Sequence, residues 1–105
     1  MTESDWKIFK QIKEKAIERY CQSCLSEFRK IIDDESSHPH ERYLRNYGLV
    51  LDSNKKMQLL FDGHSRSRAP LQLFAIRSEG LADEALVARL SAAFQEQTNP
   101  AENSW

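Results

Sequence analysis

The chain has 105 residues, of which 40% are hydrophobic and 30% are charged, a composition typical of one globular domain with a modest core. Fifteen basic against sixteen acidic side chains leave a formal charge of −1, so net charge attracts the protein neither to nucleic acid nor to an anionic membrane. No apolar run approaches the roughly 20 residues that span a bilayer, and the polar, acidic N-terminus is unlike a secretory signal.

Residues 5–34 are expected to form one long helix. Apolar residues recur at steps of three and four throughout this segment, which has no glycine or proline. Thr2 or Ser4 can cap its start, and the acidic residues at 33–35 are unfavourable at a helix C-terminus, so the helix should end near them. Its apolar positions cover well over half the circumference. This breadth predicts packing against more than one neighbour, including a second copy of the chain.

Residues 39–61 allow two interpretations. Pro39 suits a first helical turn, and the apolar residues after it fall on one helical face, which predicts a second helix with a break allowed near 52–54. The alternative is a β-hairpin at 47–61, although Val50 is the only β-branched residue in that segment. A helix is preferred. The short connection then predicts that the first two helices form an antiparallel hairpin.

Two further helices are predicted, at 67–79 and 83–96. A serine before Pro70 starts the first, Gly80 ends it, and Asp83 caps the second. The fold class is therefore all-α: a small bundle of about four helices, the first long and paired antiparallel with the second. The alternative is an α+β fold with the hairpin described above. Residues 1–96 are expected to form a single helical domain, and 97–105 a flexible C-terminal tail.

Both cysteines of the chain lie within the first predicted helix. Cys21 and Cys24, with His38 and His40 further on, are residue types that bind zinc. A helix from Cys24 to its end carries the chain about 15 Å away, so the imidazoles are expected at the far end from the thiols. A redox pair would gain acidity from a helix N-terminus, which lies turns away. We therefore expect packing residues, no metal and no cofactor, in a reducing cytoplasm.

A basic cluster precedes the third predicted helix. His64, Arg66 and Arg68 could bind phosphate or an acidic peptide, because a helix N-terminus and arginine side chains both attract anions. The competing interpretation is a solvated loop whose arginines form surface ion pairs, for instance with the acidic residues at 33–35.

No sequence pattern points to catalysis. There is no glycine-rich phosphate loop and no Gly-x-Ser-x-Gly, so we expect no enzyme. The last predicted helix has one arginine against three acidic residues, which argues against DNA binding. The expected function is a small cytoplasmic protein that binds itself or another protein, with anion binding through the 64–68 loop as the alternative. The candidate interaction surface consists of Trp6, Phe9, Tyr20 and Phe28.

Overall fold

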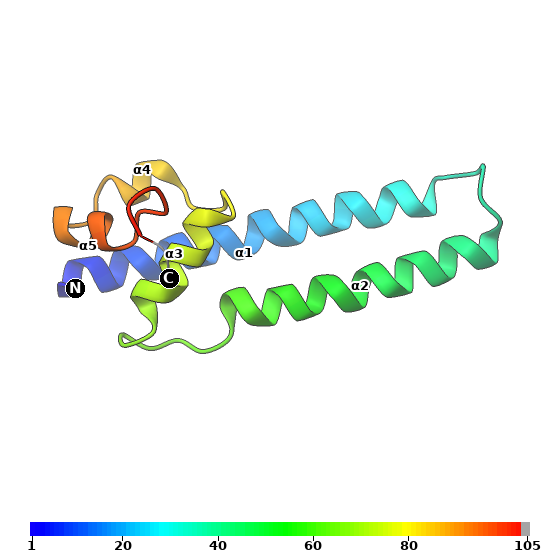
Figure 1. The fold of residues 1–105 in the computed structure, drawn as a ribbon. Helices are drawn as coiled ribbons and strands as arrows, with labels where there is room; N and C mark the ends of the chain where they lie inside the picture. The colour runs from blue at the N-terminus through cyan, green and yellow to red at the C-terminus, as the bar shows by residue number, and fades with distance from the viewer. Residues whose placement is uncertain (104–105) are drawn as a thin grey trace.

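The computed structural model describes residues 1–103, which form five α-helices (Figure 1). In chain order these are α1 (Glu3–Ile32), α2 (Pro39–Phe61), α3 (Ala69–Ser78), α4 (Glu84–Val87) and α5 (Ala92–Gln97). No strand occurs in the described residues, so the all-α prediction is confirmed and the alternative hairpin at 47–61 is wrong. The long α1 runs antiparallel to α2, as predicted (Figure 1).

α1 is one uninterrupted helix, and both of its ends are capped. The hydroxyl of Thr2 accepts a hydrogen bond from the Asp5 N–H at 2.9 Å, while the Asp5 carboxylate accepts one from the Thr2 N–H at 3.1 Å. At the other end the Asp33 N–H donates to the Arg29 carbonyl at 2.9 Å. The helix therefore stops at the acidic residues, where the sequence predicted its end.

α2 is also unbroken, so the break allowed near 52–54 does not occur. His38 caps its start, with Nδ1 accepting a hydrogen bond from the His40 N–H at 3.2 Å, and Pro39 lies in the first turn. An uninterrupted α2 can follow α1 along most of its length, which gives the antiparallel hairpin its reach (Figure 1).

Neither end of α3 depends on a side chain of its capping residue. Arg68 is its N-cap residue and makes no side-chain cap, although the Arg68 N–H donates to the Ser65 hydroxyl at 3.3 Å. At the C-terminus Gly80 has a φ of 70°, and the N–H groups of Gly80 and Leu81 donate to carbonyls of the last turn at 3.0 and 3.1 Å. Gly80 therefore fills the left-handed position expected for it.

The single helix predicted at 83–96 is two short helices, α4 and α5. The chain breaks at Ser91, whose hydroxyl caps α5 by accepting a hydrogen bond from the Phe94 N–H at 3.3 Å. The Ser91 N–H and hydroxyl both donate to the carboxylate of Asp5, each at 2.7 Å. A contact with the distant N-terminus of α1 thus replaces the hydrogen bond that would have continued the helix, and local sequence could not indicate it.

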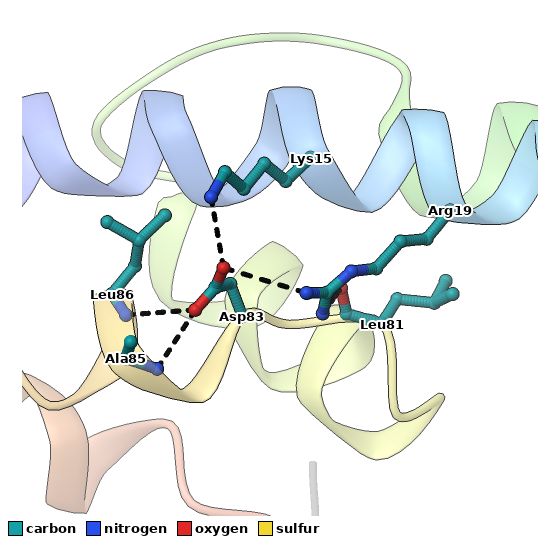
Figure 2. A network of polar contacts seen from close by, with 6 residues as sticks. All are labelled: Lys15, Arg19, Leu81, Asp83, Ala85 and Leu86. Atoms are coloured by element: carbon teal, nitrogen blue, oxygen red, sulfur yellow. Dashed lines mark hydrogen bonds and ion pairs between the residues drawn. The ribbon is translucent and has the colours of Figure 1, made fainter.

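Asp83 ties this C-terminal part to α1 (Figure 2). Its carboxylate caps α4 by accepting hydrogen bonds from the N–H groups of Ala85 and Leu86, as the sequence predicted. The same carboxylate lies 3.1 Å from Lys15 Nζ and 3.6 Å from Arg19 Nη2. One side chain therefore caps a helix and joins it to two cations of α1.

The hydrophobic core lies at one end of the molecule. Its buried side chains come from the first half of α1, the end of α2, and the chain from α3 to α5: Trp6, Ile8, Phe9, Ile12, Ala16, Leu60, Phe61, Ala69, Leu73, Ile76, Ala82, Leu86, Val87, Leu90 and Phe94. We call this part the head. Residues 17–59 extend from it as a two-helix arm that contains no buried side chain. The molecule is accordingly elongated, 53 × 23 × 23 Å (Figure 1).

Part of the predicted tail packs on the head. Thr98 is fully buried, and Arg77 donates to its hydroxyl at 3.0 Å. Asn103 donates to the Glu96 carbonyl at 2.8 Å. Thr98 therefore belongs to the packed head, residues 104–105 lie outside the described residues, and flexibility of the tail stays a prediction.

Candidate interaction surface

One face of the arm is apolar and open to solvent. We call it the arm face; it comprises Cys21, Leu25, Phe28 and Ile32 of α1 and Tyr43, Tyr47, Val50 and Met57 of α2. Leu25, Tyr43 and Tyr47 are 65%, 69% and 58% exposed. Exposed apolar side chains are ordinary when scattered, whereas a continuous patch of them is not. More than half of each of these three side chains is therefore open to solvent.

The arm face has the spacing of a helix-packing surface. On α1 its residues follow one another at intervals of four, three and four, and on α2 the first three do so at intervals of four and three. At 3.6 residues per turn, such spacing keeps each stripe on one side of its helix. The same alternation of three and four positions the side chains that interlock in coiled coils. The arm face is therefore shaped to receive other helices.

A groove of about 240 Å³ runs between the two stripes. Its walls are Tyr20, Cys21, Cys24, Leu25 and Phe28 from α1 and Val50, Ser53, Asn54 and Met57 from α2. Because both helices line the same groove, the two stripes lie on the same side of the hairpin. The groove gives a large side chain of a partner an apolar place to enter.

The reverse side of the arm is mostly polar. Its exposed polar residues are Ser23, Ser26, Glu27 and Lys30 on α1 and Arg45, Asp52 and Lys56 on α2, and Leu59, 83% exposed, lies beside α3 on the same side. Lys56 Nζ lies 3.0 Å from Glu79 at the end of α3, and Lys15 pairs with Asp83. The C-terminal helices therefore pack on the side of the hairpin that carries these charges and leave the arm face open.

The seam between the helices is polar near the tip of the arm. Arg42 and Asn46 are half-buried on α2, and Arg42 donates from Nη1 to the Ile32 carbonyl. The Nε of Arg42 and the Oδ1 of Asn46 are nevertheless buried without a hydrogen-bond partner among residues 1–103. A buried polar atom without a partner costs stability unless water or another molecule supplies its hydrogen bond, so these two atoms are open to such a partner.

Tyr20 fastens the base of the arm. Its hydroxyl donates to the Ser53 carbonyl at 2.6 Å, and its ring meets Phe61 edge-on at 5.9 Å between centroids. Burial, with a further contribution from Cys24, raises the pKa of Tyr20 to about 12. The phenol is therefore protonated at neutral pH and keeps its hydrogen bond across the hairpin.

The four aromatic residues expected to bind a partner lie in two places. Trp6 and Phe9 are buried in the head, with 8% and 0% exposure, and their rings stack 5.8 Å apart. Tyr20 and Phe28 are half-buried walls of the groove in the arm. Only the second pair is therefore placed where a partner could reach it.

The cysteines and histidines considered for zinc lie in different parts of the arm. Cys21 and Cys24 are free thiols in the groove wall, well inside α1. His38 and His40 are exposed at the start of α2, beyond the end of α1. Within residues 1–103 no group of three histidine, cysteine or acidic side chains could hold a metal ion.

The basic cluster before α3 lies against the head. The His64 ring is tilted over Trp6 at 4.6 Å and parallel to Phe9 at 6.0 Å. Arg66 lies 2.8 Å from Glu3 and over the Trp6 ring, so its ion pair is with the start of α1 and not with the acidic residues at 33–35. Those acidic residues instead include Asp34, which pairs with Arg45 at 3.6 Å.

Lys13 of α1 contacts the same loop through its ammonium group. Its Nζ donates to the Gly63 carbonyl at 2.7 Å and to Gln72 Oε1 at 3.3 Å, and it lies 3.3 Å from His64 Nδ1. Burial lowers the pKa of Lys13, Arg68 lowers it further, and Asp62 opposes both. Two acceptors and the His64 ring thus surround the ammonium group of this lysine, and the contacts stabilise the loop.

Sequence reasoning missed Leu25, Tyr43 and Tyr47 as surface residues. It placed the apolar residues of α2 on one helical face but did not indicate whether that face is covered. The relevant signal was present in the alternating spacing of both helices. Only tertiary structure shows that this shared side lies away from the C-terminal helices.

Comparison with known proteins gives no relative: no family model, curated protein or solved structure matches the chain at a significant level. Among residues 1–103, no helix has both the length and the apolar character needed to cross a membrane.

Proposed function

We propose that this protein is a protein–protein interaction module and not an enzyme, with the arm as its binding element and the head as its support. The observation that carries the proposal is the contrast between the two sides of the arm. The arm face exposes Leu25, Tyr43 and Tyr47, whereas the reverse side exposes mainly charged and hydroxyl side chains, with Leu59 as its exposed apolar residue. An amphipathic hairpin with its apolar side uncovered favours association.

The exposed side chains are of the kind that anchor interfaces. Fully burying a large apolar side chain contributes about 1.5–3 kcal/mol, and tyrosine is enriched among the residues that dominate binding energy. Tyr43 and Tyr47 are separated by one helical turn on the same side of α2. Two such anchors beside a groove can offset the entropy lost on association.

We place the protein in the cytoplasm. Cys21 and Cys24 are both free and half-exposed in the groove. Thiols of this kind persist in a reducing compartment, where disulfide formation is rare. Oxidation of either thiol would put a polar group into an apolar binding surface.

Anion binding through His64, Arg66 and Arg68 has less support as an alternative function. Arg66 forms an ion pair with Glu3, and Lys13 beside the loop already donates to the Gly63 carbonyl and to Gln72. A phosphate would have to displace these contacts before it gained its own.

Photo-crosslinking in cells tests the proposal. A benzophenone amino acid replaces Leu25 on the arm face in one variant and Ser26 on the polar reverse side in the matched control. We expect adducts with a protein from position 25 only, and their loss when Tyr47→Glu is added to the same chain. Equal adducts from both positions, or none from position 25, would contradict an interaction role for the arm face.

A further inference from the structure

We propose that the occupant of the arm face is a second copy of this chain, bound in an antiparallel two-fold dimer whose two arms form a four-helix bundle. This inference rests on the proposed interaction role and names the partner. Two antiparallel helices with apolar stripes on one shared side are half of such a bundle, and a second hairpin supplies the missing half.

The arm face is self-complementary under two-fold symmetry. Consider a two-fold axis that lies in the plane of the interface and is perpendicular to the long direction of the arms. This axis packs α1 against α1 of the other copy and α2 against α2 of the other copy, and both pairs are antiparallel. The alternating spacing of three and four occurs on both helices, so ridges and holes are available on every helix of the bundle. The groove of about 240 Å³ can then receive a tyrosine ring from the other copy.

The area required for a dimer extends beyond the arm. If the two hairpins overlap from Lys10, on the head part of α1, to Asp33, the shared length is about 35 Å at 1.5 Å per residue. Two helices of about 10 Å diameter each make the face about 20 Å wide, so each copy presents about 700 Å², of which the arm alone, about 23 Å long, supplies about 450 Å². Specific interfaces bury roughly 800 Å² from each partner, so the dimer needs contacts of the head part of α1 as well as the arm face.

The charges at the two ends of the arm favour the antiparallel arrangement. At the tip, Asp33 and Glu35 form no ion pair among residues 1–103. On the head part of α1, Lys10 forms a cation–π contact with Trp6, 5.2 Å from the ring, and no ion pair within residues 1–103. An antiparallel dimer that overlaps from Lys10 to Asp33 brings the two unpaired acidic residues of each copy near Lys10 of the other, whereas a parallel dimer sets them beside their own counterparts.

The unpaired polar atoms at the tip of the arm also favour a partner on the arm face. The Oδ1 of Asn46 and the Nε of Arg42 are buried without partners in the part of the single chain that the structure describes. A buried asparagine in a helical seam is a known means of fixing register and the number of helices, because its hydrogen bond is satisfied in only one arrangement. Both residues line a hollow at the tip beside Ile32 and Tyr43 of the arm face, so a second arm docked on this face lies next to them.

Sedimentation velocity of the full 105-residue chain, from low to high micromolar concentration, tests the inference. We expect a dimer whose dissociation constant rises at least tenfold in the double variant Leu25→Arg, Tyr47→Glu. The matched control Ser26→Arg, Asp52→Glu, on the reverse side, should leave it unchanged. A chain that remains a monomer at high micromolar concentration would overturn the inference.

Charge reversal tests the orientation. Asp33→Lys with Glu35→Lys should weaken the dimer several-fold, and adding Lys10→Glu should restore it, because the opposite charges then meet again with their signs exchanged. A dissociation constant that neither change alters, or one that Lys10→Glu raises further, would overturn the antiparallel arrangement.

The two proposals fail in different ways. If the chain is monomeric but position 25 still crosslinks to other proteins, the interaction role stands and the second copy is wrong. If the chain is monomeric and position 25 crosslinks to nothing, both are wrong. Crosslinked products with twice the mass of the chain, from position 25 and not from Ser26, support both.

Discussion

The head and the arm share α1, yet its apolar residues meet different surroundings in the two regions. In the head, α3, α4 and α5 cover the hairpin, and side chains such as Phe9 and Ile12 are fully buried. In the arm, no third layer is present within the described chain, and Leu25 remains 65% exposed. An amphipathic pattern therefore predicts that a surface will be buried, but it does not tell whether the covering surface belongs to the same chain.

The largest expected contrast is between two apolar truncations. Phe9→Ala in the head should lower the free energy of unfolding by about 3–5 kcal/mol, because it leaves a cavity in a closed core. Leu25→Ala in the arm should change it by less than about 0.5 kcal/mol when the chain is dilute enough to be monomeric. Urea unfolding followed by circular dichroism measures both. Equal losses would mean that the arm is packed as tightly as the head.

The buried carboxylate of Asp5 should come next in effect. Asp5→Asn places an amide N–H₂ opposite donors on Thr2 and Ser91 and should cost about 2 kcal/mol. Burial alone would raise the pKa of Asp5, but hydrogen bonds from Ser91 and Thr2 outweigh it and lower the pKa. Its stabilisation should therefore be present above pH 3.8 and fade as the pH falls below that value.

An acid-unfolding series measures this contribution, with Asp33→Asn as the control. Asp33 is exposed on the arm and has no side-chain partner among residues 1–103, so its replacement should leave the acid midpoint unchanged. If Asp5→Asn also left the acid midpoint unchanged, the hydrogen bonds between Asp5 of α1 and Ser91 before α5 would contribute nothing to stability.

Two glycines should respond in opposite directions. Gly48 lies inside α2 in the arm, and no atom lies within 4 Å of the place that an added Cβ would take, so Gly48→Ala should stabilise by about 1 kcal/mol. Gly80 in the head has a φ of 70°, so Gly80→Ala should destabilise by about 1–2 kcal/mol. Thermal unfolding of both variants measures the two effects. A stabilising change at Gly80 would contradict the left-handed end of α3.

The smallest expected effect concerns pH and the loop before α3. Partial burial, together with the charges of Lys13 and Lys10, lowers the pKa of His64 below 6.5. The folded state therefore binds this proton less readily than the unfolded chain, and stability should fall as the pH drops below 6.5. Because His64 is exposed at one edge, the change should be slight. A melting series from neutral to about pH 5 should show a decline that His64→Gln reduces, and an unchanged decline would remove His64 as its cause.

The sequence was sufficient to predict the elements whose signals are local. Both long helices, the cap at Asp83 and the glycine end at Gly80 follow from spacing and from side chains close in the chain. The split of the last helix could not be predicted, because Asp5 holds Ser91 across 86 positions of sequence. The candidate surface could be predicted only in part for the same reason: Phe28 was named from its helix, whereas Tyr43 and Tyr47 required knowledge of which side α3 covers.

Hydrogen–deuterium exchange at two protein concentrations tests the central claim that the head is complete in one chain and the arm is completed by another. Amides of the head should be equally protected at low and high micromolar concentration. Amides of α1 and α2 in the arm, around Leu25 and Tyr47, should exchange several-fold more slowly at the higher concentration. Exchange in the arm that does not depend on concentration would contradict the account.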